Sequence, residues 1–189
     1  LERKAVLLLM ADDQRFIAYN SRLARTIDNA AATGAIFAVS LEQMAGGLKG
    51  KETLVIGCGR VGGSAARQLI KAGSGVGLYD HEARRSEGPK RRLQAAFPCP
   101  PLAVECSLAR ALARCRLIID ACPAPGIIDR QHVGEQTIVV SPGVPHGLTP
   151  AARQALGGRF LHDSLELGVA AMLAAAAGHS FPAPQPGES

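Results

Sequence analysis

The chain has 189 residues, enough for one full domain and part of a second, and its residues are 47% hydrophobic and 4% aromatic. No stretch reaches the roughly 18 uninterrupted apolar residues of a membrane span, so the composition favours a cytoplasmic enzyme with no membrane partner. The net charge of +5 is concentrated between residues 84 and 92 with almost no aromatic residues among the basic ones, which favours a solvated helix face over a nucleic-acid site.

The cysteines are odd in number and form no Cys-x-x-Cys pair, so the sequence indicates neither a disulfide framework nor a zinc site. They are Cys58, Cys99, Cys106, Cys115 and Cys122. A reducing cytoplasm is the simplest interpretation, and no metal is predicted.

The chain opens with a predicted buried strand at 4–10, which lacks the small-residue cleavage site of a signal peptide. Because the first residue is Leu, the chain is expected to begin within a longer protein. Asp12 and Asp13 follow this strand. They form either a turn or helix cap, or a carboxylate pair that binds or deprotonates a substrate amine in a cleft. A long helix is then predicted from about residue 30 to Met44, of the kind that bridges two domains.

A glycine-rich turn follows the apolar strand at 53–56 and precedes a helical pattern at 64–71. Its first glycine permits a tight bend, its second lets the backbone approach a pyrophosphate, and its third allows the helix to pack closely on the sheet. The helix N-terminus offers amides and a positive dipole to the phosphates. The residues expected to hold them are Gly57, Gly59, Arg60, Val61 and Gly62. The segment therefore predicts a dinucleotide-binding unit, the alternative being a turn with only a packing role.

The next strand ends in Asp80, 18 residues after Gly62. At about this spacing a carboxylate meets the adenosine ribose hydroxyls, so the predicted cofactor is NAD rather than NADP. Arg84 and Arg85 lie just beyond Asp80 and could hold a 2′-phosphate, which keeps NADP as the alternative.

Strands and helices continue to alternate along the rest of the chain. Strands are predicted at 102–104, 117–122, 137–141 and 159–161, and helices at 91–97, 108–114, from Pro150 after a Thr149 cap, and at 165–177. This order is typical of an α/β fold with a doubly wound parallel sheet and right-handed crossovers. The apolar helix at 165–177 is expected to pack against the sheet or a second subunit, so a homodimer is one expected assembly.

In such sheets, ligands bind outside the carboxyl ends of the strands. Four residues that follow two of these strand ends are therefore expected near the nicotinamide and its ribose: Cys122, Pro123, Pro142 and Gly143. For Cys122 the alternative is a small apolar filler.

Several patterns spread over nearly the whole chain are more particular than the glycine loop, which alone fits many dehydrogenases. They are MADDQRFIAYN at 10–20, Asp28-Asn29, Ala32-Thr33-Gly34, VIGCGRVG at 55–62, SPGVP at 141–145 and LELGVAAML at 165–173. Together they resemble the pyrrolysine synthase family, the PylD-type dehydrogenases of pyrrolysine biosynthesis. The resemblance implies a smaller N-terminal domain before the Rossmann domain. The expected boundaries are the end of that substrate domain at 1–29, a bridging helix at 30–48, the Rossmann domain at 49–180 and a disordered tail at 181–189.

The resemblance also implies a reaction. It is the NAD-dependent oxidation of the terminal primary amine of a dipeptide-like substrate, 3-methyl-D-ornithinyl-N6-L-lysine, which then cyclises to L-pyrrolysine with loss of ammonia. Asp12 or Asp13 would take the proton of that amine. Asn20, Asn29 and Thr33 would donate to substrate groups, the alternative for each being a cap or turn role.

Three other interpretations remain open. One is another two-domain NAD(P) dehydrogenase, of the methylenetetrahydrofolate or amino-acid dehydrogenase kind. The second is a non-enzymatic NAD-sensing domain, which needs the glycine loop and Asp80 but not the pair Asp12-Asp13. The third is a nucleic-acid-binding role for the basic segment, which the scarcity of aromatic residues disfavours.

Overall fold

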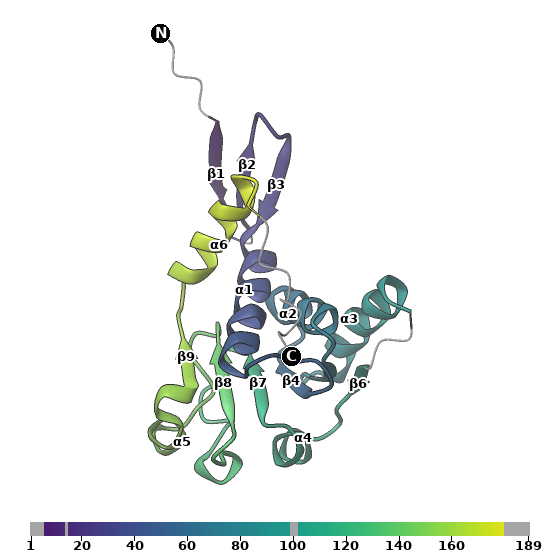
Figure 1. The fold of residues 1–189 in the computed structure, drawn as a ribbon, viewed down its shortest axis with the longest axis vertical. Helices are drawn as coiled ribbons and strands as arrows, with labels where there is room; N and C mark the ends of the chain where they lie inside the picture. The colour runs from purple at the N-terminus through teal and green to yellow at the C-terminus, as the bar shows by residue number, and fades with distance from the viewer. Residues whose placement is uncertain (1–5, 14, 99–101, 180–189) are drawn as a thin grey trace.

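The structure is a computed structural model in which residues 6–13, 15–98 and 102–179 are described (Figure 1). The strands are β1 (Leu7–Ala11), β2 (Phe16–Asn20), β3 (Arg25–Asp28), β4 (Glu52–Ile56), β5 (Gly75–Tyr79), β6 (Leu102–Val104), β7 (Leu117–Asp120), β8 (Ile138–Ser141) and β9 (Phe160–His162). The α-helices are α1 (Asn29–Met44), α2 (Arg60–Lys71), α3 (Ala83–Ala96), α4 (Leu108–Arg114), α5 (Pro150–Leu156) and α6 (Glu166–Ala176), with 3₁₀ turns η1 (Arg130–His132) and η2 (Gly157–Arg159). The predicted tail at 181–189 and Cys99 lie outside the described residues. Within the described ranges, no helix has the length and apolarity needed to cross a membrane.

The strands form two sheets. A three-stranded antiparallel sheet has the order β1-β2-β3, and a six-stranded sheet has the order β6-β5-β4-β7-β8-β9 with all neighbours parallel. The second sheet confirms the predicted doubly wound α/β fold. Because β4 pairs with β5 on one side and β7 on the other, the strand order reverses at β4. Ligands of such sheets bind outside the carboxyl ends of the strands at this reversal.

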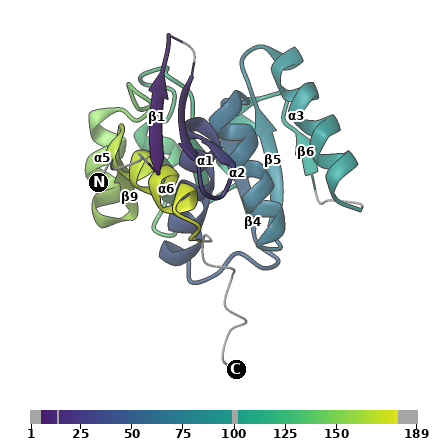
Figure 2. The same cartoon turned by 90° about the horizontal axis from the view of Figure 1, so that it is seen from above.

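Helices cover both faces of the six-stranded sheet, and the side chains of β4 show how. Val55 packs into a core with residues of α1, α2 and α3, whereas Leu54 and Ile56 pack into a second core with residues of α4 and α5. Successive strand residues point to opposite faces, so an uninterrupted apolar run is what a strand buried on both faces requires. Figure 2 shows α1 and α2 side by side on the first of these faces.

Small residues let three helices approach one another closely. A Cβ atom at Gly34 of α1 would collide with the carbonyl oxygen of Val61 in α2. A Cβ atom at Gly168 of α6 would likewise collide with the hydroxyl of Thr33 in α1. Two of the sequence patterns, at 32–34 and 165–173, therefore have a packing role, since they join α1, α2 and α6 (Figure 1).

Strand β1 differs from expectation. The sequence predicts a buried strand, but Leu8, Leu9 and Met10 are 43–52% exposed, so the prediction of burial is wrong. The reason is that β1 lies at the edge of its sheet and pairs with β2 alone among the described strands. Helix α1 follows β3 directly and runs from the small sheet to the large one (Figure 1).

Helix α3 is longer than predicted, since it begins at Ala83 rather than near residue 91. Gly88 and Pro89 disguise it in the sequence, because a proline within a helix removes a hydrogen bond and usually marks a break. Pro89 is buried, and its ring lies beside Gly63 of α2. Packing between the two helices therefore offsets the unfavourable local preference.

Candidate dinucleotide-binding site

The loop after β4 contains glycines at which neighbouring backbone atoms leave no room for a side chain. Gly57 has φ of 89° and its backbone amide donates to Tyr79 O at 2.8 Å, so the loop continues the pairing of β4 with β5. A Cβ atom at Gly62 would collide with the Gly57 carbonyl oxygen, which keeps the first turn of α2 against the strand. Beside Gly59, by contrast, an added Cβ would meet no atom of the described residues within 4 Å apart from its two chain neighbours. The loop is therefore tightly packed at two glycines and open at the third.

The open position coincides with the start of helix α2. Gly59 is its N-cap and makes no side-chain capping bond. The first intrahelical bond runs from Gly63 N to Gly59 O at 2.9 Å, so the amides of the first turn have no acceptor within the helix. Amides in this arrangement, together with the helix dipole, favour a bound anion. The structure thus brings together the predicted phosphate-binding residues.

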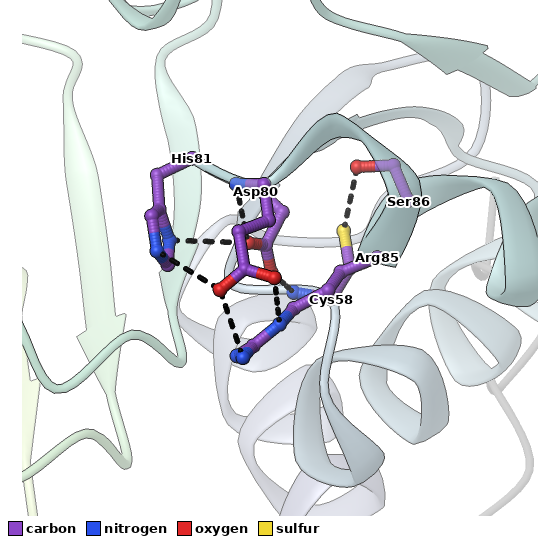
Figure 3. Close-up of polar contacts among 6 residues, drawn as sticks. Cys58, Asp80, His81, Arg85 and Ser86 are labelled. Carbon is purple, nitrogen blue, oxygen red and sulfur yellow. Dashed lines mark hydrogen bonds and ion pairs between the residues drawn. The ribbon is translucent and has the colours of Figure 1, made fainter.

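Asp80 closes the other side of the loop (Figure 3). Its Oδ2 accepts a hydrogen bond from Cys58 N at 2.8 Å, and its Oδ1 accepts one from Glu82 N at 3.1 Å. The side chain of His81 adds a contact of 3.2 Å from Nδ1 to Oδ1. Asp80 therefore ties the end of β5 to the glycine loop, a positioning role that its spacing from Gly62 did not reveal.

Two neighbours of Asp80 are engaged with other side chains in Figure 3. The guanidinium of Arg85 forms an ion pair with Glu82 at 2.9 Å. The carboxylate two residues after Asp80 in the chain therefore neutralises the charge of Arg85. Ser86 Oγ lies 3.4 Å from the buried Cys58 Sγ. Burial raises the pKa of the Cys58 thiol to about 11, so this cysteine is a neutral packing residue at physiological pH.

A fully buried carboxylate, Asp120, organises the ends of β7 and β8. Its Oδ2 accepts hydrogen bonds from Ser141 Oγ at 2.9 Å and from Gly147 N at 2.6 Å. Burial raises the pKa of Asp120, while the hydrogen bonds from Gly147, Ser141 and Cys122 act in the opposite direction. The sequence patterns did not predict this role. The available signal was an acidic residue at the end of an otherwise apolar strand.

Because Asp120 bonds to Ser141 and Gly147, the loops after β7 and β8 lie against each other. Gly143 N donates to Asp120 O at 3.3 Å, and a Cβ atom at Gly143 would lie 2.8 Å from Cys122 O. Pro142 is half-buried in the same turn and Pro123 is exposed. Burial raises the pKa of the Cys122 thiol, so it is a neutral group. The four residues predicted near the nicotinamide thus lie on two adjoining loops.

The predicted carboxylate pair lies in the turn between β1 and β2. The turn is held by Asp12, whose Oδ1 accepts from Arg15 N at 2.6 Å, while Asp13 is exposed. Arg15 lines the same cavity as Gly59, so this end of the hairpin lies on the side of the glycine loop. The structure gives Asp12 a clear role in the turn and leaves the chemical role of the pair a prediction.

The three predicted substrate-binding residues have different surroundings. Asn20 is buried, donates to Ala176 O at 2.9 Å and accepts from the amides of the following turn, so its amide is used internally. Thr33 packs against Gly168. Asn29 Oδ1 is buried and has no hydrogen-bond partner among the described residues. None of these surroundings tests a contact with a substrate, and all three substrate-binding roles stay predictions.

The reversed parallel sheet, the glycine loop and Asp80 define a Rossmann-type dinucleotide-binding fold. Solved dehydrogenases share it. Quinate dehydrogenase from Corynebacterium glutamicum, in complex with NAD, matches with a TM-score of 0.60 at 19% identity, covering 77% of this chain and 55% of that one. Shikimate dehydrogenase from Aquifex aeolicus matches with a TM-score of 0.61 at 19% identity, covering 88% and 62%.

No family model matches the chain. The chain is, however, similar to two curated pyrrolysine synthases. The identity is 27% over 175 residues with that of Methanosarcina barkeri, covering 92% of this chain and 62% of the relative. It is 26% over 170 residues with that of Methanosarcina acetivorans, covering 89% and 61%. These similarities confirm the resemblance seen in the sequence patterns. The chain spans about three fifths of the length of these relatives.

The raised pKa of Asp120 predicts a pH dependence of stability. Since the folded pKa lies above the unfolded one, the contribution of Asp120 is fully present below the unfolded pKa and is lost as pH rises through the folded pKa. The melting temperature of the wild type relative to Asp120→Asn should therefore fall as pH is raised from about 4, the ordinary pKa of Asp. Thermal unfolding of both proteins, followed at pH values from about 4 upward, tests this prediction. If the melting temperature of the wild type relative to Asp120→Asn rose with pH instead, the hydrogen bonds would outweigh burial in setting the pKa of Asp120.

Proposed function

We propose that this chain is part of an NAD-dependent dehydrogenase of pyrrolysine biosynthesis. Its substrate would be 3-methyl-D-ornithinyl-N6-L-lysine, oxidised at the carbon that bears the terminal primary amine. The observation that carries the proposal is the similarity to pyrrolysine synthases over about nine tenths of the chain. The dehydrogenase-like fold and the open glycine loop support it.

The residues at the carboxyl edge of the sheet fit a dinucleotide. The space beside Gly59 would take the pyrophosphate, the first amides of α2 would bind its oxygens, and Asp80 would accept from the adenosine ribose hydroxyls. Asp80 and Glu82 together place negative charge where NADP would carry its 2′-phosphate, and Arg85 is paired with Glu82. This arrangement favours NAD. When bound, the nicotinamide would supply the hydride acceptor for the oxidation.

The chain's own contribution to the chemistry would begin with a proton. An ammonium group has no lone pair to stabilise the carbon from which hydride leaves, so the substrate amine must first be neutral. Asp13 is exposed on the hairpin turn and would accept this proton, directly or through a water, whereas Asp12 holds the turn through Arg15 N. The carbon then loses a hydride and becomes an iminium carbon, which accounts for both electrons of the oxidation.

Ring closure would need little further catalysis. The second amine of the ornithine moiety attacks the iminium carbon within the same molecule, and the terminal nitrogen leaves as ammonia. Because the reaction is intramolecular, holding the substrate in a folded conformation is the main requirement. Asn29, whose buried Oδ1 has no partner among the described residues, is the candidate for orienting the substrate. The Asp120-held loops would form the wall beside the reacting carbon.

The cofactor assignment predicts the effect of replacing Asp80. In the full-length protein, Asp80→Ser should weaken NAD binding about 10- to 100-fold, the loss expected for hydrogen bonds to a charged group, and should narrow the preference over NADP. Asp163→Ser changes an aspartate that precedes α6 and accepts from Leu167 N; it is the matched control and should leave the preference unchanged. Calorimetric titration of the wild type and both variants with NAD and with NADP measures these affinities. Equal or tighter binding of NADP by the wild type would contradict the assignment.

The proposed reaction is tested by the aspartate pair. Asp13→Asn in the full-length protein should lower pyrrolysine formation by roughly 10²–10⁴-fold with little change in NAD affinity, because it removes the proton acceptor but keeps the shape. The lost rate should recover in part at higher pH, where more amine is neutral. Asp12→Asn, which can still accept from Arg15 N, should lose much less. Normal rates in both variants would show that neither carboxylate acts on the amine.

A further inference from the structure

A cavity of about 510 Å³ lies on the outer side of helix α2, between the start of α1 and helix α3. Four arginines from three parts of the fold line it: Arg15 of the hairpin, Arg60 and Arg67 of α2, and Arg92 of α3. Among the described residues that line the cavity, Asp28 provides the sole negative charge. Like charges repel, and a cleft lined by one sign of charge concentrates their field, so such a site attracts anions.

The local structure explains how the arginines come together. Arg60 and Arg67 are two helical turns apart and so lie on one face of α2. Between them Gly63 has no side chain, and Ser64 Oγ donates to Ala31 O at 2.6 Å, so this face stays hollow. Arg92 approaches from α3, whose Pro89 packs beside Gly63. The small residues of α2 and the apolar Pro89 and Leu93 of α3 therefore line the cavity together with the arginines.

Two of the guanidinium groups are held in place by neighbours. Arg60 forms an ion pair with Asp28, whose other carboxylate oxygen accepts from Ala31 N at 3.2 Å as the N-cap of α1. The guanidinium of Arg67 lies 5.5 Å from the centre of the Phe97 ring, a cation–π contact. Such preordered guanidinium groups lose less freedom when they bind, and their planar shape suits phosphate and carboxylate oxygens.

We propose that this cavity binds a small molecule with two or more oxyanion groups, either phosphates or carboxylates. A molecule with a single charge would leave most of the repulsion uncompensated, since four arginines face one aspartate. The volume is that of an ordinary small-molecule site. The site meets the cofactor's site at Gly59 and Arg60 but extends along α2 and α3, away from Asp80 and the turn at 142–147. It is therefore a second site, and it does not depend on the proposed reaction.

The test is a calorimetric titration of the full-length protein with pyrophosphate at constant ionic strength and with NAD at saturation. Saturable binding is expected. Arg92→Ser and Arg67→Ser should each weaken it at least about tenfold, the loss expected for one hydrogen bond to a charged group. Arg91→Ser is the matched control, since it removes the same charge from the same helix at an exposed residue outside the cavity, and it should change the affinity less than about threefold. NAD affinity should be unchanged in Arg92→Ser.

A second titration, with citrate, distinguishes whether the ligand carries carboxylates or phosphates. Binding of both anions indicates a site for oxyanions in general, and binding of pyrophosphate alone indicates a phosphate ester as the natural ligand. Competition between pyrophosphate and NAD would overturn the proposal, because the anion would then occupy the cofactor's own site. An equal loss in Arg91→Ser and Arg92→Ser would also overturn it, since only a diffuse basic surface behaves in that way.

Discussion

The approach of helix α2 to strand β4 is the contact on which the other features of the site depend. It requires Gly62 to lack a side chain, because the helix backbone meets the Gly57 carbonyl directly, while Gly57 itself packs against the backbone of Ala121 after β7. Gly34 extends the same principle to helix α1, since an added Cβ there would collide with the Val61 carbonyl oxygen of α2. The glycines thus set the position of the N-terminal end of α2, the predicted phosphate site, relative to the strands and to α1.

Two carboxylates then hold the loops that this packing creates. Asp80 accepts from the amide of Cys58 and fixes the glycine loop against β5. Asp120 accepts from Ser141 and Gly147 and fixes the turn after β8 against β7. Both are buried, so their hydrogen bonds compensate for the loss of water and are made in a weakly polar setting where each is strong. A dinucleotide laid along the carboxyl edge would therefore meet loops that are already ordered at both ends.

The sequence predicted the parallel sheet and the glycine loop well, because these depend on local patterns. Apolar runs such as the one at β4 and the position of Gly62 follow directly from how a strand and a helix must pack. The sequence was less informative where contacts between residues distant in the chain determine the structure. The exposure of β1 depends on which strands pair with it, and the length of α3 depends on packing of Pro89 against α2. The role of Asp120 depends on a turn 27 residues away.

Whether the open space beside Gly59 is the phosphate site is tested most directly by NAD titration of the full-length wild type and Gly59→Val. Gly59 has φ of −68° and ψ of −164°, a conformation open to valine, so the fold and melting temperature should be retained. The branched side chain would fill the space, and NAD binding should fall by at least about 100-fold. Gly63→Ala, one helical turn further along α2, where an added Cβ would lie 3.9 Å from Pro89 in ordinary contact, is the control and should bind NAD normally. An affinity of Gly59→Val within about threefold of the wild type would contradict the assignment of this loop.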